Sequence, residues 1–497
     1  MLEERPPSAQ PPLGTTDRGP LPNETLAHSN ATSSSLAVSR LRSAVILSRF
    51  DRVALVTLLG LALLTLLLVW RGDQIGVQVV AVSPAEGATE VSTRAVMQVT
   101  FDQKIAAVGS GFPLSVSPPV SGTLRWEEAT VAFVPAQTLA PDTTYTVTLT
   151  TDLKSQQGRP LQGSLTWQFH TRRPRVLYVA PDSQGNDQLF VISPEGGQPT
   201  QLTQEKLGVW DYTLSPAGAT LMYAALRQDG GSDLWEIATD GTGQRQLLAC
   251  PEAACSGAAW SPDGRRLVYE RRNMLVPGAA PGPPHLWWLD PATGETVPVF
   301  QDNQWLGYGA RWSPDSNWLS YVSPSNQGVQ VYNVNDGRSF LIPSQMGGLA
   351  VWSPQGDALL VTDIQRQEEG FAVHLLRADP TNGKLTDLSG SEAGVEDGSP
   401  AWSPDGAWIA LARKAAGASM GKQLWLMRPD GSEARYLTDD PEIHHGLPEW
   451  SPDSRYLLYQ SYPLKELGAQ PGVWLLDTQT ERAQELITPG NRPTWLP

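Results

Sequence analysis

The chain has 497 residues and a formal net charge of −15, with 42 Pro, 45 Gly and 18 Trp. This composition favours a turn-rich β architecture, and the length allows two or three domains with sizeable cores. Basic residues form no run beyond a few arginines near residue 50, so nucleic acid is not an expected partner. The acidity mainly favours solubility.

Residues 1–52 are predicted to form a disordered cytoplasmic tail. Residues 1 to about 38 are rich in Pro, Ser, Thr and Asn and carry few large apolar groups, which is typical of chains that bury no core. Asn23 and Asn30 each begin a glycosylation sequon by pattern alone. A cytoplasmic tail would keep both unglycosylated.

An uncharged, Leu-rich run of 18 residues begins at Val53 and ends at Trp70. At about 1.5 Å per residue it spans about 27 Å, close to the thickness of a bilayer core. Residues 40–52 hold four arginines against one aspartate, so the positive-inside rule places the N-terminus in the cytoplasm. A cleaved signal peptide is the alternative, but the long leader and the lack of an Ala-x-Ala-like site favour an uncleaved signal anchor. Residues 71–77 are expected to be a linker.

Residues 78–172 alternate apolar and polar positions, with Pro and Gly at intervals, which predicts a small antiparallel β-sandwich. Segments 82–88, 99–102, 139–145 and 167–171 resemble the bacterial Ig-like domain of the SbsA type, in that family's order. Tyr145 is expected to pack or to cap a corner. The resemblance implies a spacer or adhesive module outside a bacterial cell.

The phrase Trp-Ser-Pro-Asp-Gly repeats through the remaining chain. Its best copies begin at Trp260 and Trp402, close copies begin at Trp312, Trp352 and Trp450, and a weaker copy begins at Leu214. The prolines stand at 216, 262, 314, 354, 404, 452 and 497, with successive differences of 46, 52, 40, 50, 48 and 45. Such a period indicates stacked supersecondary units, each unable to bury its apolar face alone.

Each unit is predicted to contain four antiparallel strands, and therefore to be one blade of a β-propeller. Trp402 ends the first strand, and Pro404, Asp405 and Gly406 supply the turn into the second. Residues 175–203 lack a first strand, and residues 492–497 supply one with nothing after it. We therefore predict an all-β propeller of seven blades over residues 173–497, closed by strand 492–497, with six or eight blades as alternatives. Closure removes exposed strand edges.

The propeller repeats resemble the TolB-type family, whose repeats carry this phrase, over about two thirds of the chain. Gln355 and Ala217 depart from the Asp of the motif, and seven blades exceed the six usual in TolB itself. These departures indicate a relative of the repeat class rather than a TolB orthologue. The role of TolB in an outer-membrane system is therefore not transferred.

Cys250 and Cys255 are the two cysteines of the chain, with four residues between them. In an oxidising compartment they could close a small surface loop between the second and third blades. Two reduced thiols are the alternative. A metal site made from two cysteines alone is not expected.

The sequence contains no Gly-x-Ser-x-Gly elbow and no His-Glu-x-x-His pair, and its six histidines are scattered, so no catalytic residue, metal site or cofactor is predicted. The motif Trp and Asp residues are interpreted as packing and turn residues. Ligand contacts are expected where the repeats disagree, in the loops just before each inner strand, which ring one mouth of the propeller channel. The candidates are Trp210, Asp211, Tyr308, Glu396, Asp397, His444, His445 and Asn491.

These aromatic, carboxylate and imidazole groups suit a peptide or a small polar ligand, and ordinary loop variability is the alternative. The acidic run at 439–442 is expected to be a solvated loop rather than a cation site. Three functions stay open. The first is a non-enzymatic, membrane-anchored extracytoplasmic binding or scaffold protein for an envelope protein or peptide. The second is a channel enzyme acting on envelope glycan or peptide, which would need converging carboxylates or metal ligands. The third is a transmembrane sensor, for which the tail offers no recognisable folded domain.

Overall fold

A computed structural model describes residues 48–72, 76–106, 114–150, 153–274, 280–302, 304–367, 370–390, 394–415, 417 and 421–497. The chain divides into two compact units, Met1–Asp73 and Gln74–Pro497. The expectations for residues 1–47, including the sequons at Asn23 and Asn30, lie outside the described residues, as does the middle of the expected linker.

The helix of the first unit, α1 (Arg49–Gly72), contains the predicted membrane segment. Within the described residues, its stretch Arg49–Leu67 is the one candidate membrane span by length and composition, and none of it is buried inside the structure. The hydroxyls of Thr57 and Thr65 donate to carbonyls four residues earlier at 2.9 Å and 2.7 Å. The helix therefore satisfies these polar groups internally, as an apolar surrounding requires.

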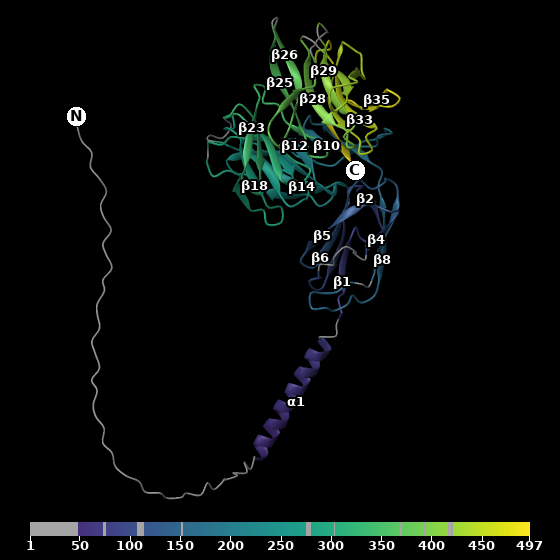
Figure 1. The fold of residues 1–497 in the computed structure, drawn as a ribbon, viewed down its shortest axis with the longest axis vertical. Coiled ribbons are helices and arrows are strands. Elements are labelled where there is room, and N and C mark those ends of the chain that lie inside the picture. The colour runs from purple at the N-terminus through teal and green to yellow at the C-terminus, as the bar shows by residue number, and fades with distance from the viewer. Residues whose placement is uncertain are drawn as a thin grey trace, which may run out of the picture. The chain divides into compact units, whose positions relative to one another are not determined.

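The Ig-like part of the second unit is a sandwich of two four-stranded sheets in the described residues, as expected (Figure 1). One sheet has the order β1 (Val79–Ser83), β3 (Met97–Phe101), β6 (Thr130–Pro135) and β5 (Gly122–Glu127), and the other has the order β2 (Ala88–Val91), β8 (Leu165–Thr171), β7 (Thr144–Leu149) and β4 (Leu114–Ser117). Trp167 and Tyr145 lie in the core between them. The Tyr145 hydroxyl also accepts a hydrogen bond from the Ala140 amide at 2.9 Å, so this residue both packs and holds a corner.

The described residues after the sandwich form seven four-stranded blades. Six blades are continuous in sequence, and the first two are β12 (Val209–Leu214), β13 (Thr220–Leu226), β14 (Ser232–Ala238) and β15 (Arg245–Leu248), followed by β16 (Ala253–Trp260), β17 (Leu267–Asn273), β18 (His285–Leu289) and β19 (Thr296–Pro298). The next two are β20 (Tyr308–Trp312), β21 (Trp318–Ser323), β22 (Gly328–Asn333) and β23 (Ser339–Pro343), followed by β24 (Val351–Trp352), β25 (Leu359–Gln367), β26 (Gly370–Ala378) and β27 (Leu385–Asp387). The last two are β28 (Glu396–Trp402), β29 (Ile409–Lys414), β30 (Gln423–Met427) and β31 (Arg435–Tyr436), followed by β32 (Ile443–Trp450), β33 (Tyr456–Pro463), β34 (Gly472–Asp477) and β35 (Arg482–Ile487).

The seventh blade combines the two ends of the propeller. Its order is β36 (Asn491–Leu496), β9 (Arg175–Pro181), β10 (Asp187–Ile192) and β11 (Thr200–Gln201). The C-terminal strand β36 pairs antiparallel with β9, and Trp495 lies opposite Val176. The last strand of the chain thus occupies the inner position that the first propeller segment leaves open.

The repeated phrase builds the turn between the first and second strands of a blade. In one copy the Ser403 hydroxyl donates to Asp405 at 2.5 Å and accepts from the Trp408 amide at 2.9 Å. Where Gln355 replaces the aspartate, Ser353 donates instead to Asp357 at 2.7 Å. The departure from the motif is therefore compensated two residues later.

The inner strands all begin at one face of the ring and end at the other. We call the face where they begin the mouth face; it carries the loops that lead into the inner strands and the hairpins between second and third strands. The face carrying the Trp-Ser-Pro-Asp-Gly turns is the turn face. The hairpin of β25 and β26 rises from the mouth face beyond its neighbours (Figure 1).

The Ig-like domain is joined to the turn face of the propeller by Arg172, which follows β8. Its buried guanidinium donates to the carbonyls of Pro497 and Gly218 at 2.8 Å and 3.0 Å, and to the Thr239 hydroxyl at 3.0 Å. A second link connects Arg265 to Glu127 at 2.7 Å. Arg172 therefore ties the junction to the end of the closing strand.

Candidate functional site

The eight predicted ligand residues lie at the mouth face, but in the first residues of the inner strands rather than in the loops before them. This corrects the expectation. Most inner strands carry a β-bulge or register irregularity, as between Gly398 and Ala401 in the middle of β28 and between Gly446 and Glu449 in the middle of β32. A bulge interrupts the alternation of side chains between the two faces of a strand. The sequence pattern that leads to the motif therefore does not reveal the residues of the strand that lie before the bulge.

Two of the eight residues are buried inside their blades and do not reach the mouth. Asp397 forms a bidentate ion pair with Arg413, at 2.6 Å and 2.7 Å, and is 1% exposed. His445 is buried against Tyr459, and neither ring nitrogen has a hydrogen-bond partner in the described structure. Burial lowers the pKa of His445 to about 4, so the ring is neutral at pH 7. These two residues belong to the core.

The other polar candidates already have partners within the propeller. Glu396 pairs with Lys414 at 2.9 Å, and His444 stacks on Tyr462 with ring centroids 5.0 Å apart. Burial lowers the pKa of His444, and nearby Lys422 lowers it further. The Tyr308 hydroxyl donates to the Gly347 carbonyl at 3.3 Å, and the Asn491 side chain accepts from Arg492 at 3.2 Å.

Trp210 and Asp211 are adjacent in β12 and differ in exposure. The indole of Trp210 is 59% exposed. Asp211 instead accepts a hydrogen bond from the Gly257 amide at 2.5 Å. Burial raises the pKa of Asp211 to about 6, and the Gly257 hydrogen bond offsets part of this effect. Trp210 is thus available to a partner, whereas Asp211 joins two neighbouring inner strands.

Four charged residues on or beside the inner strands were missed by the sequence analysis: Glu270, which lies on β17 and accepts from the Gly309 amide, and Arg311, Glu449 and Arg492, which lie on inner strands. The signal for two of them lies in the repeat itself. The position just before the motif tryptophan holds Ala259 and Ala401 in two copies, but Arg311 and Glu449 in two others. A charged residue at an inner-strand position that holds alanine in other repeats could have been selected as a candidate residue beside the channel.

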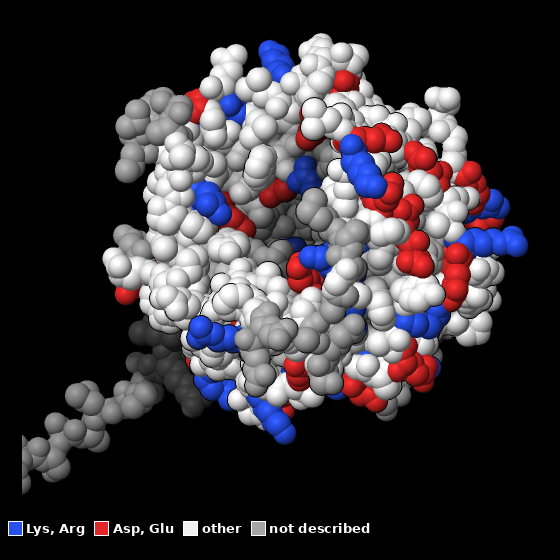
Figure 2. Space-filling model, turned by 90° about the horizontal axis from the view of Figure 1, so that it is seen from above, with Lys and Arg blue, Asp and Glu red and all other residues white. Residues whose placement is uncertain are grey.

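The mouth face also exposes large apolar side chains. They lie in the loops leading to inner strands, at the start of the inner strand β12 and in the hairpins between second and third strands: Leu207, Trp210, Trp305, Met346, Leu349, Phe371 and Leu467. The most exposed of those in or beside a strand are Phe371 at 68% and Trp210 at 59%. Figure 2 shows a surface hollowed near its centre, with acidic and basic side chains around the hollow. Apolar anchors among polar groups are typical of protein-binding surfaces.

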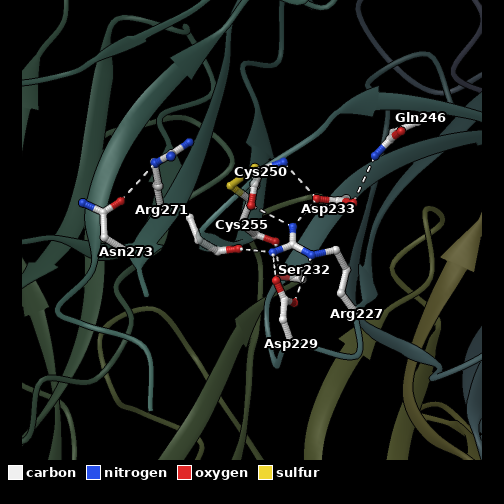
Figure 3. The surroundings of a disulfide bond; sticks show 10 residues. Arg227, Asp229, Ser232, Asp233, Gln246, Cys250, Cys255, Arg271 and Asn273 are labelled. Atoms are coloured by element: carbon white, nitrogen blue, oxygen red, sulfur yellow. Dashed lines mark hydrogen bonds and ion pairs between the residues drawn. A yellow bond between two sulfur atoms is a disulfide. The ribbon is translucent and has the colours of Figure 1, made fainter. Parts of the chain in front are cut away.

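Cys250 and Cys255 form a disulfide in the structure (Figure 3). Pro251 and Glu252 between the cysteines are exposed in a turn, so the disulfide closes a short surface loop as expected. Both cysteines themselves are fully buried, because Cys255 lies within β16 and packs in the core between two blades. Arg227 donates to the Cys250 carbonyl at 2.7 Å, and Asp233 accepts from the Cys250 amide at 2.8 Å. The disulfide and this ion network hold the loop between the second and third blades at the mouth face.

Among the described residues, no group of three or more His, Cys, Asp or Glu side chains is arranged to hold a metal ion. Two residues of the acidic run at 439–442 have partners within the protein: Asp440 accepts from the Glu442 amide at 3.1 Å, and the Glu442 carboxylate pairs with Lys465.

The chain matches two protein families. Residues 73–171 match the bacterial Ig-like domain family, and residues 169–419 match the TolB beta propeller domain family. Among curated proteins it is similar to the uncharacterized protein Atu1656 of Agrobacterium fabrum, at 28% identity over 41% of this chain and 64% of that protein. It is also similar to the uncharacterized peptidase YuxL of Bacillus subtilis, at 23% identity over 30% of this chain and 28% of that protein. The chain therefore spans less than two thirds of the length of either relative.

Solved structures with a similar fold include TolB from Acinetobacter baumannii, at 15% identity, with a TM-score of 0.41 over 78% of this chain and 84% of that chain. Another is a Mycobacterium tuberculosis puromycin-hydrolyzing peptidase, at 15% identity, with a TM-score of 0.48 over 71% of this chain and 54% of that chain. The matched residues 169–419 cover half of the sequence and include the propeller strands from β9 to β29. The chain belongs to the TolB beta propeller domain family, with a bacterial Ig-like domain before the propeller.

Proposed function

We propose that this protein is a membrane-anchored binding protein that uses the mouth face of its propeller as an extracytoplasmic platform for an envelope protein or peptide. The observation that carries the proposal is the set of exposed apolar side chains on that face, led by Trp210 and Phe371. A few side chains supply most of the binding energy at a protein interface, and aromatic residues are enriched at such interfaces.

Three features support the extracytoplasmic orientation. Arginines on the N-terminal side of the apolar segment favour a cytoplasmic N-terminus. Helix α1 is long and apolar enough to act as the anchor. The disulfide between Cys250 and Cys255 suits an oxidising compartment, since such bonds are rare in the cytosol.

The buried disulfide network also suits a binding role. It holds one loop of the mouth face in place before a partner arrives, which reduces the ordering cost of association. Other polar candidates of the mouth face, such as Glu396 and His444, already have partners within the propeller. They would form the rim of an interface rather than its centre.

The test is cross-linking in intact spheroplasts with a membrane-impermeant lysine reagent, followed by recovery of the full-length protein. We expect discrete adducts with the wild-type protein and their loss in a variant carrying Trp210→Ser and Phe371→Ser. Tyr436→Ser is the matched control, because Tyr436 is 57% exposed but lies on the outer strand β31. Equal adducts in both variants would reject the mouth face. Labelling only after lysis would reject the orientation.

A further inference from the structure

A cavity of about 490 Å³ lies at the turn-face end of the propeller channel. Its walls come from the inner strands β12, β16 and β20, including the apolar side chains of Leu214, Trp260 and Trp312. The Ig-like domain contributes Arg94, from the loop between β2 and β3. That loop is held in place, because the Arg94 amide donates to the Ser92 hydroxyl at 3.0 Å and Ser92 itself is buried.

Two arginines from different domains face this cavity, Arg94 and Arg311. Protein surrounds both side chains, and this desolvation lowers the pKa of each, while carboxylates at longer range offset part of the effect. Both residues are nevertheless exposed to solvent, because they border the open cavity and many protein atoms lie near them without covering them. Within the described residues, no carboxylate lies within 4.0 Å of either guanidinium, and the Arg311 guanidinium donates to the Ala310 carbonyl at 3.1 Å.

The nearby carboxylates are already used to join one blade to the next. Each accepts a hydrogen bond from a backbone amide of the following inner strand: Asp211 from Gly257 at 2.5 Å, Glu270 from Gly309 at 2.7 Å, and Glu449 from Trp495 at 3.2 Å. These carboxylates therefore have a structural role in the ring. The donors of Arg94 and Arg311 are left facing the cavity.

We propose that this cavity binds a small carboxylate ligand between the guanidinium groups of Arg94 and Arg311. The planar guanidinium fork matches a carboxylate with two parallel hydrogen bonds. The volume lies within the range of small-molecule sites, and the apolar walls strengthen such charged hydrogen bonds. Because Arg94 comes from the Ig-like domain and Arg311 from β20, the bound ligand bridges the two domains.

A route into the cavity exists from the side of the Ig-like domain. The cavity shares Arg94, Pro216 and Trp260 with a crevice of about 1230 Å³ between that domain and the turn face. The site is separate from the proposed mouth-face platform, since it lies at the opposite end of the inner strands. Failure of one proposal therefore leaves the other standing.

The test is titration calorimetry of the full-length protein in detergent, in low-chloride buffer, with succinate as the probe and inorganic phosphate in a second arm. We expect wild-type protein to bind succinate, and Arg94→Gln and Arg311→Gln each to weaken binding about tenfold or more, the loss expected for a charge-assisted contact. Arg338→Gln is the charge-matched control, because Arg338 is 74% exposed and pairs with Asp336 on the surface. It should bind as the wild type does.

Arg311→Lys keeps the positive charge without the fork, and its binding should fall between those of the wild type and Arg311→Gln. Thermal unfolding of each variant separates lost binding from lost folding, and Arg94→Gln changes a different domain from Arg311→Gln. No heat with succinate in the wild type, or equal affinities in both glutamine variants and the wild type, would overturn the proposal. Tighter binding of phosphate than of succinate would overturn the carboxylate assignment.

Discussion

The indole N–H of Trp450 donates to the Ala401 carbonyl of the preceding blade at 3.1 Å. Trp312 makes the equivalent bond to Ala259 at 3.1 Å. Trp402, by contrast, has no partner for its indole nitrogen within the described structure. At the residue scale, the motif tryptophans therefore combine packing with bonds between neighbouring blades, and individual copies differ in whether they form that bond.

Trp450→Phe should lower the free energy of unfolding by about 1 kcal/mol more than Trp402→Phe, because only the first change removes a hydrogen bond while both keep an aromatic ring. The measurement is chemical denaturation of the purified full-length protein, followed by tryptophan fluorescence or circular dichroism. Equal losses in the two variants would show that the indole bond to the preceding blade adds nothing beyond packing.

The structural role of the motif could be predicted from its residues, because Pro, Asp and Gly have local conformational preferences that survive in any tertiary setting. The direction of side chains at the mouth could not. Asp397 and His445 follow Glu396 and His444 directly, so each pair alternates across the strand and one member is buried. Which member is buried depends on bulges in β28 and β32, and pairing register is a tertiary property.

Strand β36 is the element on which ring closure depends. It covers the edge of β9, and its Trp495 is 4% exposed and packs with Val176 and Leu475. The repeat count could predict such a strand over 492–497, because the first propeller segment lacks an inner strand and the C-terminal segment has one without a blade. The structure has this strand at Asn491–Leu496. The bulge at its start, which adds the first residue, leaves no comparable signal.

Deletion of residues 491–497 should lower the unfolding temperature and cause aggregation, because the edge of β9 loses its partner and becomes free to pair with another chain. Trp495→Ala is a milder change that keeps the backbone pairing and should cost about 3–5 kcal/mol from lost packing. Differential scanning calorimetry with light scattering measures both effects. A deletion variant that melts like the wild type would contradict a role for β36 in closure.

On the scale of the whole molecule, the position of Arg172 couples the two β domains. It is 6% exposed and donates to groups from three separate segments, the C-terminal end, the turn after β12 and the turn after β14. Burial lowers the pKa of Arg172 to about 10, with a further contribution from Arg175, so it stays charged at pH 7. No sequence pattern marks this arginine, because its partners are mostly backbone carbonyls brought together by ring closure.

Arg172→Ala should therefore destabilise the junction by about 3 kcal/mol, because it leaves buried acceptors without a charged donor. In calorimetry we expect the Ig-like domain and the propeller to unfold in a single transition in the wild type and in two separate transitions in this variant. Arg173→Ala is the matched control: Arg173 is 71% exposed and pairs with Asp142 at 2.7 Å on the surface, where solvent screens the charges, so its loss should leave the unfolding profile nearly unchanged. If both variants kept a single transition at the wild-type temperature, the coupling would have to come from other contacts, with Arg265 and Glu127 the next pair to change.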